Sequence, residues 1–113
     1  MYKVRTYNKL SAKGLDRFNS ENYDVSSDIA DPDAFMLRSQ KLHDEEIPTS
    51  VKAVARAGAG VNNIPIEKFT EKGIVVFNTP GANANAVKEL IASALFISSR
   101  DIFGGMNYVQ GLT

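Results

Sequence analysis

Arg56-Ala-Gly-Ala-Gly-Val-Asn-Asn63 carries the clearest fold signal in this chain, because it follows the apolar run Val51 to Ala55. A second stretch of the same kind, Asn78-Thr-Pro-Gly-Ala-Asn83, follows Ile74-Val-Val-Phe77. Each pattern is typical of a buried strand that leads into a loop of small residues and then a helix. Ligands of open parallel sheets bind at the carboxyl ends of the strands. The first stretch therefore predicts part of a binding crevice, with an arginine beside it.

Further strands and helices are predicted before and between these two stretches. A β-rich alternation, a weak strand and a continuous apolar run predict three more strands, over residues 2–7, 23–26 and 34–37. The last of these has the pattern of a strand buried on both faces. The fourth strand is predicted over residues 51–57 and the fifth over residues 74–77.

The helices are predicted from their end signals. Ser11 is a suitable N-cap for a short helix that continues to Phe18. Asn62 or Asn63 can cap a helix that runs to about Lys72, where Gly73 ends it. A long helix is predicted over residues 85–101.

This alternation of strands and helices predicts an α/β fold. We expect a three-layer α/β/α sandwich with a flavodoxin-like parallel five-stranded sheet, followed by the long helix. That helix is apolar over most of its circumference, which is typical of a buried helix. We infer that the chain is a fragment whose last helix packs against a missing domain or a second subunit. The alternative is a packed C-terminal helix with a frayed tail from Gly104 onward.

Composition excludes several classes of function. Thirteen Lys and Arg residues balance thirteen Asp and Glu residues, which argues against a nucleic-acid or anionic-membrane partner. The longest apolar stretch, over residues 90–97, is too short to cross a bilayer. The chain has no cysteine, so it offers no disulfide, thiolate nucleophile or cysteine metal site, and we expect a cytoplasmic protein. The single histidine, His43, lies in a polar loop and is expected to be solvated rather than catalytic.

The glycines after the fourth strand do not form a dinucleotide fingerprint. The third glycine of that motif would fall at Asn63, and the strand that ends at Asn78-Thr79 lacks the acidic residue that contacts a ribose. Gly58 and Gly60 could instead let main-chain N–H groups approach an anion. The alternative is a tight turn that needs positive φ angles.

Two arginines are predicted to face one crevice. Arg38 and Arg56 both stand at the ends of predicted strands, and arginine recognises carboxylate and phosphate groups through paired hydrogen bonds. Together they suggest a small, doubly anionic ligand, unless each arginine pairs with a nearby Asp or Glu. Asn83 beside Pro80-Gly81 could form the turn or reach the ligand.

Three segments resemble the D-2-hydroxyacid dehydrogenase family: Val54-Ala-Arg-Ala-Gly-Ala-Gly-Val-Asn-Asn-Ile64, Lys72-Gly-Ile-Val-Val-Phe-Asn-Thr-Pro-Gly-Ala-Asn83 and Val87-Lys-Glu-Leu90. The strand Ala34-Phe-Met-Leu-Arg-Ser39 fits the same family. The likeness is greatest to the members that oxidise 3-phosphoglycerate. It departs from many relatives at Asn62, where they have aspartate, and at Lys88, where they have a small residue.

The resemblance implies substrate-binding roles for part of this chain. Arg38 and Ser39 would meet the substrate phosphate, and Arg56, Ala57 and Gly58 would meet its phosphate and carboxylate. Ala59 would touch the nicotinamide end of NAD, and the Asn83 turn would line the site. The implied ligand is a small anionic 2-hydroxy acid, and no metal site is implied.

The resemblance also implies a domain organisation. Residues 1–84 would be the first segment of the substrate-binding domain, and residues 85–113 would be a crossing helix and the start of an NAD-binding domain. The catalytic residues and most of the NAD site would lie outside this chain, so it would be inactive alone. The crossing helix would pack in a homo-oligomer interface.

Three hypotheses follow. The chain belongs to an enzyme that oxidises 3-phosphoglycerate with NAD in serine biosynthesis, or to a relative that acts on glycerate, hydroxypyruvate or another 2-hydroxy acid. The third is a stand-alone flavodoxin-like binding module. The absence of an acidic cluster at Asn8-Lys9-Leu10 argues against a receiver-like module.

Overall fold

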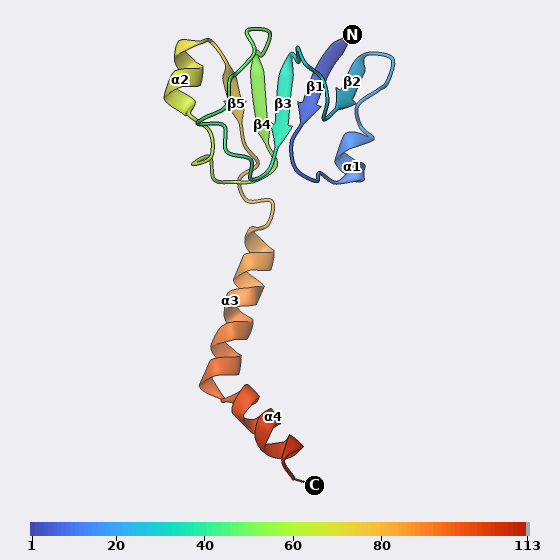
Figure 1. Ribbon diagram of the computed structural model, residues 1–113. Coiled ribbons are helices and arrows are strands. Elements are labelled where there is room, and N and C mark those ends of the chain that lie inside the picture. Colours follow the sequence, from blue (N-terminus) through green and yellow to red (C-terminus); the bar gives the residue numbers. More distant parts are fainter. Residues whose placement is uncertain (113) are drawn as a thin grey trace. The chain divides into compact units, whose positions relative to one another are not determined.

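The computed structural model describes residues 1–112, in two compact units that divide after Pro80. The first unit holds a five-stranded sheet and two short helices, and the second holds two helices (Figure 1). We describe each unit by itself.

The sheet of the first unit is entirely parallel. Its strands are β1 (Tyr2–Thr6), β2 (Tyr23–Ser26), β3 (Ala34–Leu37), β4 (Ala53–Arg56) and β5 (Val75–Phe77), in the order β2-β1-β3-β4-β5. The predicted α/β fold with five parallel strands is confirmed. β4 is shorter than predicted, since pairing with β3 begins only at Ala53. The chain changes direction across the sheet between β1 and β3, which makes the gap between these strands the topological switch point.

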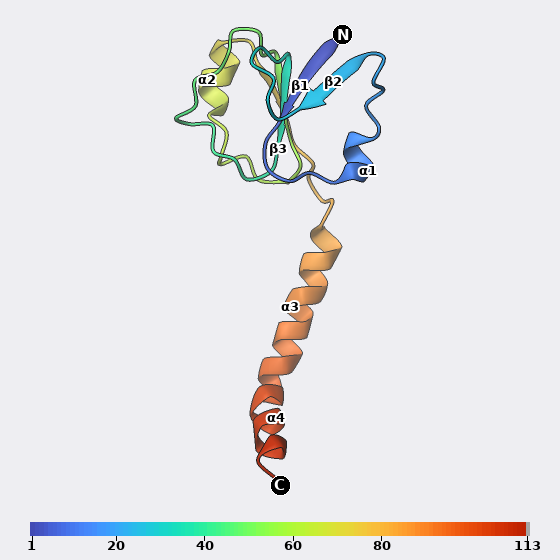
Figure 2. The ribbon, with the colours of Figure 1, turned by 45° about the vertical axis from the view of Figure 1, so that its right-hand side comes forward.

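The core lies on one face of the sheet. Phe35, Leu37 and Val54 are buried there, together with five residues from the flanking segments, namely Leu42, Val51, Ile64, Phe69 and Ile74. On the opposite face Ala34 and Met36 are only half-buried. The prediction that the strand over residues 34–37 is buried on both faces is therefore wrong. Figure 2 shows the reason, since α1 (Ala12–Leu15) and α2 (Ile66–Glu71) lie on opposite sides of the sheet and α1 is too short to cover its side.

α1 ends earlier than predicted. It spans four residues instead of continuing to Phe18, and Ser11 stands at its N-cap position without a capping hydrogen bond from its side chain. Gly14 lies inside this helix, where glycine lowers helical stability. The short helix leaves a hollow of about 430 Å³ over the sheet, lined in part by Val4, Phe18 and Met36.

α2 ends as predicted but begins differently. Gly73 follows it with a φ of 72°, a left-handed conformation that glycine adopts without steric cost. Pro65 stands at the N-cap position, and neither Asn62 nor Asn63 caps the helix. Asn63 is buried and its side chain donates to main-chain oxygens of the loop after β3, so it is not available to α2.

The second unit contains α3 (Ala84–Ser99) and α4 (Ile102–Gln110). The helix predicted over residues 85–101 is present as α3 but ends two residues earlier, because Asp101 has a φ of 45° and breaks the helical path. The Asp101 carboxylate accepts a hydrogen bond of 3.2 Å from the N–H of Gly104 and so starts α4. A side chain at position 104 would collide with this carboxylate. The alternative of a frayed tail from Gly104 onward is therefore wrong, since the chain is helical through Gln110.

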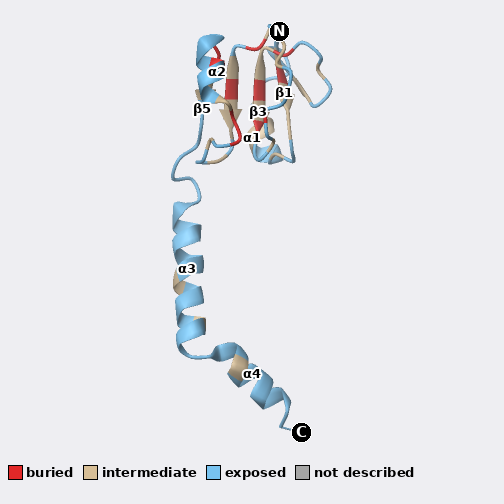
Figure 3. Cartoon of the chain, turned by 60° about the vertical axis from the view of Figure 1, so that its left-hand side comes forward, coloured by how far each residue is buried: buried red, intermediate tan, exposed pale blue. Residues whose placement is uncertain are grey.

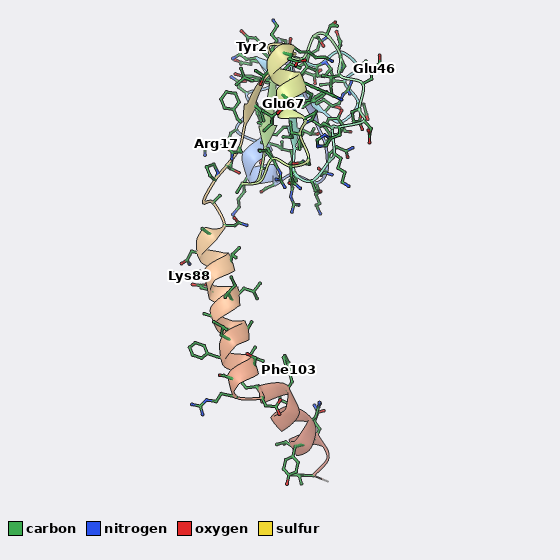
Figure 4. All side chains as sticks on the ribbon, turned by 90° about the vertical axis from the view of Figure 1, so that its left-hand side faces the viewer. Tyr2, Arg17, Glu46, Glu67, Lys88 and Phe103 are labelled. Carbon is green, nitrogen blue, oxygen red and sulfur yellow. The ribbon has the colours of Figure 1, made fainter. Side chains whose placement is uncertain are left out.

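Both helices of the second unit expose apolar side chains. In Figure 3 the ribbon of these helices is coloured as exposed over almost its whole length. Phe103 projects from α4 and is 64% exposed (Figure 4). The other large exposed apolar residues of this unit include Leu90, Ile91, Leu95, Phe96, Met106, Tyr108 and Val109. Across residues 1–112, even α3 falls short of the length and apolarity that a bilayer-spanning helix needs.

Candidate functional site

The loops that carry the two arginines meet at the carboxyl edge of the sheet. Arg56 is the last residue of β4 and pairs in register with Leu37, the last residue of β3. Arg38 and Ser39 follow directly, and the N–H of Ala57 donates a hydrogen bond of 2.8 Å to the main-chain oxygen of Leu37. The sequence prediction that Arg38 and Arg56 stand at neighbouring strand ends is confirmed.

The Arg56 side chain folds back over its own loop. Its Nε donates a hydrogen bond of 2.8 Å to the main-chain oxygen of Arg38. A Cβ atom at Gly60 would lie 3.0 Å from Arg56 Nη1, and one at Gly58 would lie 3.3 Å from Arg56 Nε. Among the glycines that the structure describes, positive φ angles occur at Gly73 and Gly81 and not in this loop. The two glycines thus make room for a guanidinium, and the alternative of a turn with positive φ angles is wrong.

Neither arginine is neutralised by an acidic side chain within residues 1–112. The one ion pair of that range joins Lys3 to Asp31. Arg38 Nη1 donates a hydrogen bond of 3.2 Å to the main-chain oxygen of Lys9. Because each guanidinium carries five N–H donors, both arginines retain donors that can meet an anion. The alternative in which each arginine pairs with an Asp or Glu is wrong for the described part of the chain.

Asn8 holds the loop after β3 from one side. Its side-chain Oδ1 accepts hydrogen bonds from three successive N–H groups, those of Arg38 (3.2 Å), Ser39 (3.1 Å) and Gln40 (3.0 Å). Asn8 has a φ of 65° and follows β1, so these contacts lie at the switch point between β1 and β3. The sequence analysis did not assign Asn8 to the site. An asparagine directly after a strand is the only local signal, since its partners lie 30 residues away.

Asn63 holds the same loop from the other side. Its Nδ2 donates to the main-chain oxygens of Arg38 (3.1 Å) and Gln40 (2.8 Å). The side chain is 6% exposed, and its Oδ1 has no partner within the described residues. The segment 38–40 is thus bound through its N–H groups by one asparagine and through its carbonyl groups by another.

The loop after β5 is joined to the loop after β4. Asn78 Nδ2 donates a hydrogen bond of 2.9 Å to the main-chain oxygen of Ala59, and the N–H of Thr79 donates to the oxygen of Gly58 (3.0 Å). Ala59 itself is exposed. The six-residue helix α2 begins only at Ile66, so this loop does not lead directly into a helix N-terminus as a dinucleotide site requires. This loop therefore lacks the geometry that binds a whole dinucleotide, and the contact of Ala59 with a cofactor stays a prediction.

Asn83 belongs to the second unit. It stands at the N-cap position of α3, and its side chain makes no capping hydrogen bond. Its role in lining a site stays a prediction. His43 is exposed, as expected of a surface histidine, and its Nε2 lies 2.8 Å from the main-chain oxygen of Asn62. No cluster of acidic, histidine or cysteine side chains suited to a metal ion occurs in the part of the chain described here.

Comparison with known proteins identifies the family. Residues 4–102 match the model of the D-isomer specific 2-hydroxyacid dehydrogenase catalytic domain. A hydroxypyruvate reductase of Thermotoga maritima is 35% identical over 74% of this chain and 32% of its own length. A D-3-phosphoglycerate dehydrogenase of Methanocaldococcus jannaschii is 36% identical over 66% of this chain and 15% of its own length.

A solved structure gives the same result for the fold. The NAD⁺-bound 3-phosphoglycerate dehydrogenase of Entamoeba histolytica superposes with a TM-score of 0.70 and 29% sequence identity, over 85% of this chain and 38% of that chain. The present chain spans about a third or less of the two curated relatives named above. The family model covers most of the chain and the parallel sheet agrees with it, so the chain belongs to the D-isomer specific 2-hydroxyacid dehydrogenase family.

Proposed function

We propose that this chain supplies the substrate-binding segment of an NAD-dependent oxidoreductase that converts 3-phosphoglycerate to 3-phosphohydroxypyruvate in serine biosynthesis. The observation that carries the proposal is the pair of arginines at adjacent strand ends, linked by the hydrogen bond from Arg56 Nε to the oxygen of Arg38. A substrate with a phosphate at one end and a carboxylate at the other suits two guanidinium groups at one sheet edge. Relatives named D-3-phosphoglycerate dehydrogenase support this choice.

In this proposal the residues of the first unit bind and orient the substrate. Arg38 and Ser39 meet the phosphate, while Arg56, Ala57 and Gly58 meet the phosphate and the carboxylate. The glycines help, because a guanidinium and a ligand can both approach a main chain that carries no side chains. The Asn83 turn lines the site from the segment that leads into α3.

The remaining functions belong to a longer parent protein. Residues 1–84 form the first segment of its substrate-binding domain, and residues 85–113 form the crossing helix and the start of its NAD-binding domain. NAD is held mainly by that domain, with Ala59 in contact with its nicotinamide end, and it supplies the hydride acceptor when bound. The exposed apolar side chains of α3 support packing in a homo-oligomer interface. We place the parent in the cytoplasm and expect this chain to be inactive alone.

The test is a kinetic comparison in the complete parent protein. Arg56→Ala should raise the KM for 3-phosphoglycerate by about tenfold or more, because a lost charge-assisted contact costs ~1.5–3 kcal/mol. Lys72→Ala is the matched control, since Lys72 is an exposed cation just before β5, at the opposite edge of the sheet. An unchanged KM in the Arg56→Ala enzyme would exclude the assigned role.

A second candidate substrate is hydroxypyruvate or glycerate, which the 35% identity to a hydroxypyruvate reductase favours. The complete parent should be assayed with each acid in its phosphorylated and unphosphorylated form. A preference of kcat/KM for the phosphorylated acid supports 3-phosphoglycerate, and the reverse preference supports the second candidate. If the parent prefers the phosphorylated acid, Arg38→Ala should lower kcat/KM for that acid and leave kcat/KM for the unphosphorylated acid unchanged.

A further inference from the structure

We infer that Asn8 is a positioning residue of the substrate site, which presents Arg38 and Ser39 to an anionic ligand without placing a negative charge beside it. This inference rests on the proposed function, since it assumes that the ligand at this edge is an anion. Asn8 lies 30 residues before Arg38 in the chain, and its position directly after β1 is the one local feature that points to the site.

Asn8 holds the main chain of the segment 38–40, and its neighbour Lys9 contacts the Arg38 side chain. Its Oδ1 accepts the N–H groups of Arg38, Ser39 and Gln40, at 3.2, 3.1 and 3.0 Å. The neighbouring residue, Lys9, accepts the Arg38 Nη1 hydrogen bond through its main-chain oxygen. The loop after β1 therefore fixes the main chain of Arg38 through Asn8 and one nitrogen of its guanidinium through Lys9.

The contacts on the other side complete the restraint. Asn63 Nδ2 donates to the oxygens of Arg38 and Gln40, and Arg56 Nε donates to the oxygen of Arg38. Rotating the Arg38–Ser39 peptide would break bonds on both sides, because its oxygen accepts from Asn63 and Arg56 and its N–H donates to Asn8. The three N–H groups and the oxygens of Arg38 and Gln40 are occupied in this way, so the Arg38 and Ser39 side chains are the main groups that this segment offers to a ligand.

The choice of asparagine over aspartate is informative. Three converging N–H groups form the kind of concavity that binds anions, and a carboxylate there would accept stronger, charge-assisted bonds than an amide does. Asparagine and aspartate both tolerate the left-handed backbone of residue 8, which has a φ of 65°. Loop stability alone thus favours aspartate. A carboxylate at this place would, however, sit beside Arg38 and repel an anionic substrate.

Two substitutions separate the positioning effect from the charge effect. Asn8→Gly keeps the left-handed backbone and removes the acceptor. In the 113-residue chain it should increase the hydrogen-exchange rates of the Arg38, Ser39 and Gln40 amides by about tenfold, which corresponds to a loss of ~1.4 kcal/mol, because these amides lose their common acceptor. Wild-type exchange rates at all three amides would overturn the positioning role.

Asn8→Asp keeps the acceptor and adds a charge. These three amides should exchange no faster than in the wild-type chain. In the complete parent, the KM for 3-phosphoglycerate should rise about tenfold while kcat changes less than about twofold, and the rise should shrink when salt increases from about 50 mM to about 500 mM. A purely structural role predicts no rise, so a wild-type KM in the Asn8→Asp enzyme would overturn the inference.

The results that would refute the proposed function differ from those that would refute the role of Asn8. If the wild-type parent prefers another 2-hydroxy acid, the substrate assignment is wrong, and the same KM comparison is made with that acid, which is also an anion. If the wild-type parent turns over no 2-hydroxy acid, both the proposed function and the charge effect are refuted before any variant is measured. The exchange rates of the Asn8→Gly chain still decide whether Asn8 positions the loop.

Discussion

Arg56 Nε donates a hydrogen bond of 2.8 Å to the main-chain oxygen of Arg38. The arginine at the end of β4 is thus anchored to the residue that follows β3, and the anchor is a main-chain atom that does not move with the Arg38 side chain. Only one of the five Arg56 donors is used in this contact, so the rest of the guanidinium can meet a ligand. Two cations that are held in this way lose little conformational entropy when they bind an anion.

Asn63 is expected to be the most sensitive polar residue of the first unit. Asn63→Ala should lower the free energy of unfolding by about 1–3 kcal/mol, because the part-buried main-chain oxygens of Arg38 and Gln40 lose this donor. Asn63→Asp should cost more, since a carboxylate would face two carbonyl oxygens in a buried place. Urea denaturation of the 113-residue chain measures both effects.

The adjacent Asn62→Ala provides the control for this prediction. Asn62 is exposed, and its contact with His43 is made by its main-chain oxygen, which alanine retains. Asn62→Ala should therefore change the stability by less than about 0.5 kcal/mol. Equal losses in the Asn62→Ala and Asn63→Ala chains would contradict the assignment.

A side chain at position 73 should lower the stability of the first unit. Its φ of 72° costs an L-residue about 1–2 kcal/mol, so Gly73→Ala should lower the thermal midpoint of the first unit even though a Cβ atom would meet no neighbour. Gly14→Ala is the matched control, because Gly14 lies in α1 without a positive φ and has open space around it. Alanine there should be neutral or stabilising by up to about 1 kcal/mol. The reverse order of the two variants would refute this account.

The Lys3–Asp31 pair should contribute a small, pH-dependent stability. Lys3 Nζ lies 3.0 Å from Asp31 Oδ2, and this hydrogen bond and charge hold the pKa of the Asp31 carboxyl below its ordinary value of 3.8. The same bond raises the pKa of Lys3 above 10.5. The stabilisation by this ion pair is therefore fully present between pH 3.8 and pH 10.5, the ordinary pKa values of the two groups. It is lost as the pH falls through the lowered Asp31 pKa or rises through the raised Lys3 pKa.

Asp31→Asn tests this pair. The wild-type chain should be slightly more stable than the variant near neutral pH, with a difference that vanishes in acid and shrinks in high salt, because both side chains are exposed. Asp44→Asn is the matched control, since Asp44 is exposed and forms no ion pair within residues 1–112, and it should change the stability near neutral pH by less than about 0.5 kcal/mol. If the wild-type chain is still more stable than the Asp31→Asn chain at a pH below the lowered Asp31 pKa, the loss of stability does not come from the ion pair.

The apolar surface of α3 should drive association of the isolated chain. Leu95 and Phe96 are 64% and 71% exposed, so replacing both with glutamine should shift the sedimentation profile toward monomer at equal concentration. Lys88→Gln changes a polar residue of the same helix, labelled in Figure 4, and should leave the profile unchanged. A wild-type chain that stays monomeric over the whole concentration range would count against the homo-oligomer proposal.

Much of the fold was predictable from local patterns. The strands over residues 53–56 and 75–77 could be predicted because each apolar run ends at small or turn-forming residues. The proximity of Arg38 and Arg56 could be predicted because neighbouring parallel strands end at one edge of the sheet. The helix ends were less predictable. The break between α3 and α4 depends on the left-handed backbone of Asp101 and its carboxylate on Gly104, and neither shows in the periodicity of the apolar residues.

The two asparagines of the site show why the rest could not be predicted. Asn63 has the local signature of a helix cap, yet its partners lie 23 and 25 residues earlier in the chain. Asn8 has the signature of a turn residue, and its partners lie 30 to 32 residues later. A side chain that can satisfy either a neighbour or a distant main-chain group is assigned correctly only when the tertiary structure is known.

Gly58 and Gly60 lie beside the Arg56 guanidinium, so one short loop supplies both the arginine and the space that its side chain occupies. Residues 56 to 60 contain both the arginine and the two glycines. A substitution at one of the glycines can therefore change the position of the guanidinium while the arginine is retained. A methyl group at position 60 would push Nη1 outward by a few tenths of an ångström, because 3.0 Å is shorter than ordinary van der Waals contact. Position 60 is therefore where directed evolution could tune ligand length in small steps.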